Sequence, residues 1–216
     1  FSFKKEKVTA VAYSQSNVAQ LVLFTFLLEK RKVTAYSFGN LSKNSLEEIE
    51  QYLVEQIAKA KLHREQGILV TLLNEIIGFC RDTTQKDKAL QYCKELLALL
   101  DEMQLEGSVS YATSLLNIAN AYRAFGLWAE AEEAFQIIEK TYEICLEKED
   151  YLWASMYNNW GLLYQETKEY QKSVVILQKA LDLIVQIPNS KIKEAITKTN
   201  FANSLFSLQK EDSIKK

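Results

Sequence analysis

The sequence predicts an all-α protein, and three observations lead to that fold class. The 216 residues include only six glycines and one proline, whereas average usage would give roughly 26 of the two together. Sheets and barrels need many turns, and turns need these residues. Apolar residues also recur at helical spacing, and one pattern repeats along the chain. A hydrophobic content of 48% excludes a disordered chain.

The repeat is clearest in two segments that begin at Leu115 and Tyr157 and match at a spacing of 42. The matched pairs are Ala119 with Gly161, Tyr122 with Tyr164, Trp128 with Tyr170 and Ala131 with Ser173. A later copy, shifted by 41, contains 200–203, and a weaker earlier copy contains Ile77, Arg81 and Ala89. A period of this length predicts an array of stacked repeats.

Each copy is expected to form two helices joined by a short break. The first helix carries one apolar face, made in the second copy by Leu115, Ile118, Ala119 and Tyr122. Gly126 marks the break, and Pro188 with Asn189 marks the clearest helix stop. A small residue, Ala119 or Gly161, would let the second helix approach closely, and Gly78 falls near that position in the weak copy. One hairpin cannot bury both its faces, so neighbouring hairpins must stack.

This pattern resembles the tetratricopeptide repeat (TPR). The matching residues are Leu115, Ile118, Ala119, Tyr122, Gly126, Trp128, Ala131 and Phe135, then Tyr157, Trp160, Gly161, Tyr164, Tyr170, Ser173, Leu177 and Ala180. The resemblance covers about 65–209 and implies a right-handed TPR-like α-α superhelix, with longer helices than a 34-residue repeat has. Segments 72–81 and 111–123 look like the repeats of bacterial TPR proteins that are fused to a nucleotidyltransferase-like domain.

The N-terminal part, residues 1–44, has no clear pattern and is treated as a segment separate from the repeat domain, 45–216. Segments 8–13 and 33–38 read as short strands, and 18–32 as a helix or a third strand. Ser45 and Glu48 form a capping box, which predicts a helix from there to about Lys61.

Composition also limits the function. A formal net charge of -2 gives no electrostatic reason to expect nucleic acid as a partner. The most apolar stretch, 18–28, is too short to span a membrane. The odd number of cysteines has no metal-like spacing and is typical of the cytoplasm, with Cys80 and Cys93 at core positions. The sequence holds no catalytic motif and gives no reason to expect a cofactor or a metal.

A polar surface is expected on the side of each first helix that lies opposite its apolar face. The resemblance implies that this side lines a concave groove. Its candidate residues are Asn74 and Arg81 in the first copy, Asn117, Asn120 and Arg123 in the second, Asn158, Asn159 and Gln165 in the third, and Asn200 and Asn203 in the fourth. Amide side chains offer donors and acceptors together, which suits the backbone of an extended peptide. The alternative is that some of these asparagines only bond between adjacent helices.

TPR modules that grip a terminal carboxylate combine two asparagines with cations, and Asn120 and Asn159 match the asparagine positions. The matching basic positions hold Leu116, Ile196 and Asn200. The cations are absent from these positions, so a carboxylate clamp is not expected.

The sequence therefore favours a non-enzymatic scaffold that binds a protein or peptide segment in a TPR groove. Two alternatives stay open: a sensor of signalling peptides, or the non-catalytic repeat half of a nucleotidyltransferase-like enzyme. The aromatic side chain of Phe206 is expected to be exposed near the end of the repeats. An exposed aromatic side chain there indicates that the protein could self-associate as a homodimer.

Overall fold

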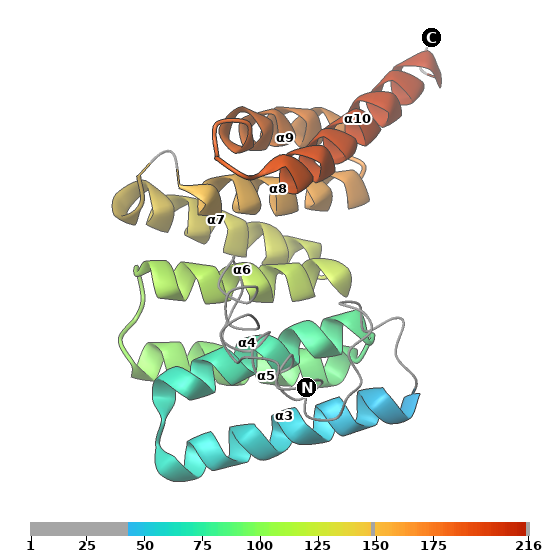
Figure 1. The fold of residues 1–216 in the computed structure, drawn as a ribbon. Helices are drawn as coiled ribbons and strands as arrows, with labels where there is room; N and C mark the ends of the chain where they lie inside the picture. Colours follow the sequence, from blue (N-terminus) through green and yellow to red (C-terminus); the bar gives the residue numbers. More distant parts are fainter. Residues whose placement is uncertain (1–42, 148–149, 215–216) are drawn as a thin grey trace, which may run out of the picture. The chain divides into compact units, whose positions relative to one another are not determined.

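The computed structural model describes residues 43–147 and 150–214 (Figure 1). Within these ranges the chain forms eight α-helices and no strand, which confirms the predicted fold class. The helices are α3 (Lys43–His63), α4 (Gln66–Asp82), α5 (Lys86–Glu102), α6 (Val109–Ala124), α7 (Trp128–Cys145), α8 (Tyr151–Glu166), α9 (Tyr170–Ile184) and α10 (Lys191–Ile214). The elements expected over 8–13, 18–32 and 33–38 lie outside the described residues.

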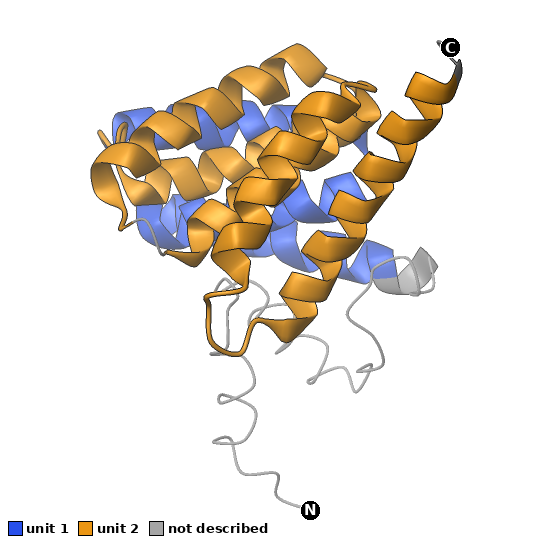
Figure 2. Ribbon diagram, turned by 90° about the horizontal axis from the view of Figure 1, so that it is seen from above, with its two compact units in different colours: residues 1–103 blue, residues 104–216 orange. Residues whose placement is uncertain are grey.

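The chain divides into two compact units, Phe1–Met103 and Gln104–Lys216 (Figure 2). In the first unit, α4 and α5 form a helical hairpin and α3 packs against α4. Its core includes Cys80 and Cys93, which are fully buried and unpaired, as the sequence predicts. In the second unit, hairpins α6–α7 and α8–α9 stack through α7 and α8, and α10 packs against α8 and α9.

The turn inside each hairpin has the same backbone form in all three copies. Thr84, Gly126 and Lys168 lie 42 residues apart, and each has a positive φ, of 59°, 73° and 62° respectively. In the last of these turns, Lys168 N–H donates to the carbonyl of Gln165 and the next N–H donates to that of Tyr164. These bonds satisfy carbonyls that the end of a helix leaves unpaired. Only one copy uses glycine here, which is part of the reason why the chain contains so few.

The predicted close approach occurs at Gly161. A Cβ atom at this position would lie 2.7 Å from Cδ2 of Leu177 on α9, closer than real Cβ atoms come to a neighbour. The hydroxyl of Ser173 donates to the Gly161 carbonyl at 2.8 Å, so side chains of α9 reach the backbone of α8 directly. The matching residue of the previous copy, Ala119, is fully buried.

Several sequence expectations are wrong in detail. Helix α3 begins at Lys43, so Ser45 lies inside its first turn and does not cap it, and the helix continues two residues past Lys61. Gly78 is not a close-approach position, because a Cβ there would meet nothing within 4 Å. The last helix does not stop at Gln209 but runs to Ile214, since no helix-breaking residue follows Gln209.

Replacing Gly161 by alanine should destabilise the protein by about 1–3 kcal/mol, because the added methyl group overpacks the α8–α9 contact. Gly78→Ala is the matched control: it lies inside α4 with open space around it and should gain about 0.5–1 kcal/mol. Urea unfolding followed by circular dichroism measures both changes. Equal stability of the two variants would contradict the close approach.

Replacing Lys168 by glycine should stabilise the second unit by up to about 1 kcal/mol, because a side chain costs energy in the left-handed region. The reciprocal change, Gly126→Ala, should destabilise the same unit by a similar amount. Thermal unfolding of the two variants measures the pair. A loss of stability in Lys168→Gly would mean that the lysine side chain contributes more than its backbone strain costs.

Candidate functional site

The candidate site is the polar face of the second unit, formed by the first helices of consecutive repeats, α6, α8 and α10. Arg123 at the end of α6 forms an ion pair with Glu166 at the end of α8. Asn200 on α10 donates from Nδ2 to Oδ1 of Asn158 on α8 at 3.1 Å. These two links bring predicted groove residues from three helices to one side of the unit.

Two buried atoms on α6 have no hydrogen-bond partner among the described residues. They are Oδ1 of Asn120 and Nε of Arg123. The two residues are half-buried and three positions apart, so they are neighbours on the surface of the helix. A buried polar atom without a partner costs about 1–3 kcal/mol, so each such atom in a folded protein needs an explanation.

Three predicted residues bond between adjacent helices, as the alternative reading proposes. Besides the Asn158–Asn200 bond, Gln165 on α8 donates from Nε2 to the Asn200 carbonyl and to Oγ of Ser204, both at 2.6 Å. Ser204 is fully buried, and its Oγ lies 2.8 Å from Oγ of Ser173 on α9. This network attaches α10 to the α8–α9 hairpin.

The other predicted residues of the face differ in their surroundings. Asn159 is half-buried and donates to the Ser155 carbonyl of its own helix at 2.9 Å. Asn117 is also half-buried, whereas Asn203 is exposed. Leu116 occupies a position that the resemblance places on the polar side, but its side chain is buried in the core. The buried face of α6 therefore includes more positions than the four apolar residues that defined it in the sequence.

In the first unit, Asn74 and Arg81 lie on α4. Nδ2 of Asn74 donates to the Val70 carbonyl at 3.0 Å, and Nε of Arg81 donates to Asp82 at 2.9 Å. Sequence reasoning missed Glu75, which is half-buried on the same helix. Burial raises the pKa of its carboxyl group to about 7, although Arg81 lowers that pKa and Asp82 raises it further. Glu75 lies 42 residues before Asn117, so the repeat register alone could have identified it.

A ladder of aromatic and charged side chains fixes α8 against α7 and α9. The hydroxyls of Tyr157 and Tyr164 donate to Glu139 and Glu132 of α7 at 3.0 and 2.8 Å. The ammonium groups of Lys179 and Lys172 of α9 lie 5.0 and 5.1 Å from the centres of the same two rings. Burial, reinforced by these carboxylates, raises the pKa of both tyrosines, which stay neutral donors. Cation–π contacts of this kind contribute about 0.5–1 kcal/mol each.

The chemistry available at the polar face is hydrogen bonding rather than charge. Its one ion pair, Arg123 with Glu166, neutralises itself, and the remaining predicted residues are amides. Over 43–147 and 150–214, no group of three histidine, cysteine, aspartate or glutamate side chains is arranged to hold a metal ion. None of the helices in this part of the chain is long and apolar enough to cross a membrane.

Comparison with known proteins finds a match between the two central hairpins and a repeat family. Residues 112–142 and 153–187 match the tetratricopeptide repeat. These matches coincide with α6–α7 and α8–α9, the two copies that are clearest in the sequence. TPR repeats generally mediate protein–protein interactions, and scaffolds of this fold are typically non-catalytic. No curated protein matches the sequence.

Solved structures share the fold at low sequence identity. TPR-like repeats from Podosopora anserina, named after a kinesin light chain, have a TM-score of 0.63 and 15% identity, and the match covers 80% of this chain and 83% of that one. BtubC (BKLC) from P. vanneervenii has a TM-score of 0.64 and 18% identity, covering 97% of this chain and 86% of that one. At these identities the comparison establishes the TPR-like helical fold.

The raised pKa of Glu75 should make stability fall as pH rises. The folded protein holds this proton up to about pH 7, whereas an unfolded glutamate releases it near pH 4.5. Between these values the folded state binds more protons, so the Glu75 contribution is complete below pH 4.5 and is lost as pH rises through 7. The loss is about 3 kcal/mol, since each pKa unit corresponds to about 1.4 kcal/mol.

Glu75→Gln isolates this effect, because glutamine keeps the shape of the protonated acid and does not titrate. The variant should match the wild type at pH 4 and exceed it in stability at pH 8, as measured by urea unfolding at both values. Parallel stability profiles of the two proteins would contradict the assignment.

Proposed function

We propose that the second unit binds an extended segment of a partner protein across its polar face. The observation that carries this proposal is the pair of buried, unpartnered atoms on α6, Asn120 Oδ1 and Arg123 Nε. The two atoms are an acceptor and a donor, and a peptide backbone offers the complementary donor and acceptor at each residue. A bound segment would offset the cost of leaving them unsatisfied after a small movement of the two side chains.

The charge of the face favours an uncharged internal segment as the ligand. A terminal carboxylate would need cations, yet the one arginine of the face is paired with Glu166. The amides of Asn117, Asn120 and Asn159 can bond to a backbone whatever its side chains are, which gives affinity with little sequence preference.

The remaining expectations about cellular context stay predictions. Cys80, Cys93 and Cys145 are all unpaired, and Cys145 is exposed, which supports a reducing compartment such as the cytoplasm. The bacterial repeat type, its link to a nucleotidyltransferase-like domain and a role in sensing signalling peptides rest on the sequence resemblance alone.

A peptide selected from a random display library against the full chain provides the probe. Isothermal titration calorimetry should give an affinity about tenfold lower for the Asn120→Ala, Asn159→Ala double variant, because two hydrogen bonds of about 0.5–1.5 kcal/mol each are lost.

Gln136→Ala is the matched control, since Gln136 is an exposed amide on α7 and lies outside the polar face. It should leave the affinity unchanged. A folded double variant that binds the peptide as tightly as the wild type would refute the use of this face.

A further inference from the structure

The fully buried side chains of α10 are polar and its apolar Phe201 and Leu208 are half-buried, whereas other large apolar side chains lie exposed on its opposite side. Among the described residues of α10, the buried side chains are those of Thr197 and Ser204. Thr197 bonds to the Lys193 carbonyl of its own helix, and Ser204 joins the network with Gln165 and Ser173. By contrast, Ile192 and Phe206 are 79% and 69% exposed. This is the reverse of the usual orientation of an amphipathic helix.

The register of the repeat explains which surface is uncovered. At a shift of 41, Gly161 and Tyr164 of α8 correspond to Ala202 and Leu205 of α10. In α8 both residues are buried, and the second helix of the hairpin packs onto Gly161 through Leu177. In α10 the corresponding residues are exposed. The exposed side of α10 is therefore the surface that accepts a second helix in the preceding repeat.

We call this surface the open face of α10. It consists of Ile192, Ala195, Ala202, Leu205 and Phe206, all exposed in the described part of the chain. At 100° per residue these positions fall on one side of the helix, with the two alanines along its centre and the larger side chains beside them. Small residues at the centre allow another helix to approach closely, as Gly161 does for α9.

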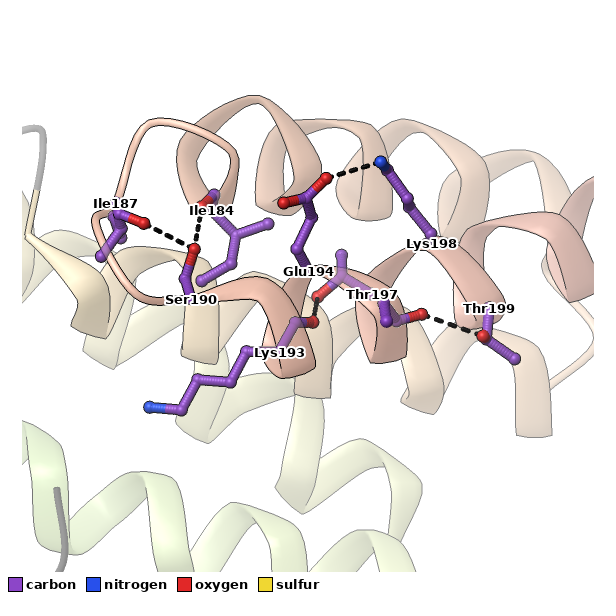
Figure 3. A network of polar contacts seen from close by, with 9 residues as sticks. Ile184, Ile187, Ser190, Lys193, Glu194, Thr197, Lys198 and Thr199 are labelled. Atoms are coloured by element: carbon purple, nitrogen blue, oxygen red, sulfur yellow. Dashed lines mark hydrogen bonds and ion pairs between the residues drawn. The ribbon is translucent and has the colours of Figure 1, made fainter. Parts of the chain in front are cut away.

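The turn before α10 holds the start of this helix in place. Ser190 is buried, and its Oγ lies within hydrogen-bond distance of the carbonyls of Ile184 and Ile187, at 2.8 and 2.6 Å, so that its one proton is shared between them (Figure 3). On α10 itself, Lys198 and Glu194 form an ion pair at 2.5 Å along the edge of the open face. This pair leaves the central alanines uncovered.

We propose that the open face of α10 binds the same face of a second copy of this chain, with the two helices antiparallel and the two-fold axis close to Ala202. A self-complementary patch closes into a dimer without leaving a free surface. In this register Phe206 of each copy lies beside Ala195 and Thr199 of the other, so the large ring covers the small side chain.

The charges on α10 favour the antiparallel arrangement. The exposed Lys191 begins the helix and the exposed Asp212 lies in its last turn, on the same flank of the open face. Antiparallel pairing about Ala202 brings each lysine opposite the aspartate of the other copy, since the two residues are nearly equidistant from the axis. Parallel pairing would place like charges together and align the two helix dipoles unfavourably.

Sedimentation equilibrium of the full chain tests the dimer. The wild type should reach the mass of a dimer as concentration rises, and Phe206→Glu should weaken the association at least tenfold. Leu205→Lys is a second variant of the same face, and circular dichroism confirms that each protein is folded. Ile144→Glu is the matched control, because Ile144 is 85% exposed but lies on α7.

Cysteine cross-linking tests the register. In a Cys145→Ser background, Ala202→Cys should form a disulfide between copies, because the two sulfurs would meet near the axis. Lys210→Cys should not, since eight residues at 1.5 Å each place its two copies about 24 Å apart along the helices.

Several outcomes would overturn the proposal. These are a wild type that stays monomeric at high concentration, a dimer that survives both open-face variants, or cross-linking at position 210 in place of 202. A monomer that instead binds a peptide of the α9 sequence would assign the open face to an amphipathic helix from another source.

Discussion

The need to cover α8 on two sides organises the second unit. This helix has apolar and aromatic residues around most of its circumference, so a single hairpin partner cannot bury it. On one side Phe135 of α7 stacks on Trp160 at 5.7 Å, and on the other Leu177 of α9 occupies the space that a side chain at Gly161 would fill. Because both contacts must form at once, they fix the rotation of α8 and with it the direction of every other residue on the helix.

The polar face follows from that rotation. Once the rings of Tyr157 and Tyr164 point toward α7 and α9, the remaining side of α8 can carry only groups that accept solvent or neighbouring first helices. Asn158 and Gln165 lie there and bond to α10. Tyr157 and Tyr164 donate hydrogen bonds to carboxylates of α7, and lysines of α9 lie over both rings. These directional contacts fix the position of α8 along its neighbours, which apolar packing alone does not determine.

Those features of the fold that depend on residue type and spacing were predictable from the sequence. The 42-residue spacing located the hairpins, and the absence of a side chain at Gly161 located their closest contact. The left-handed turns at Thr84 and Lys168 were not predictable, because the hydrogen bonds of the helix end impose that conformation on residues that do not favour it. The sequence allowed some asparagines to bond between adjacent helices but could not identify Asn158 and Asn200 as such a pair, since by sequence they do not differ from asparagines that face solvent.

The attachment of α10 connects the polar face with the open face. Hydrogen bonds contribute about 0.5–1.5 kcal/mol each in water, whereas burying a large apolar side chain contributes about 1.5–3 kcal/mol. In the described part of α10 no apolar side chain is fully buried, so this helix is held more weakly than α8, which buries three tryptophan or methionine side chains. Covering Phe206 and Leu205 would add the apolar burial that α10 lacks. Association through the open face would thus also stabilise the Asn158–Asn200 bond and the last helix of the polar face.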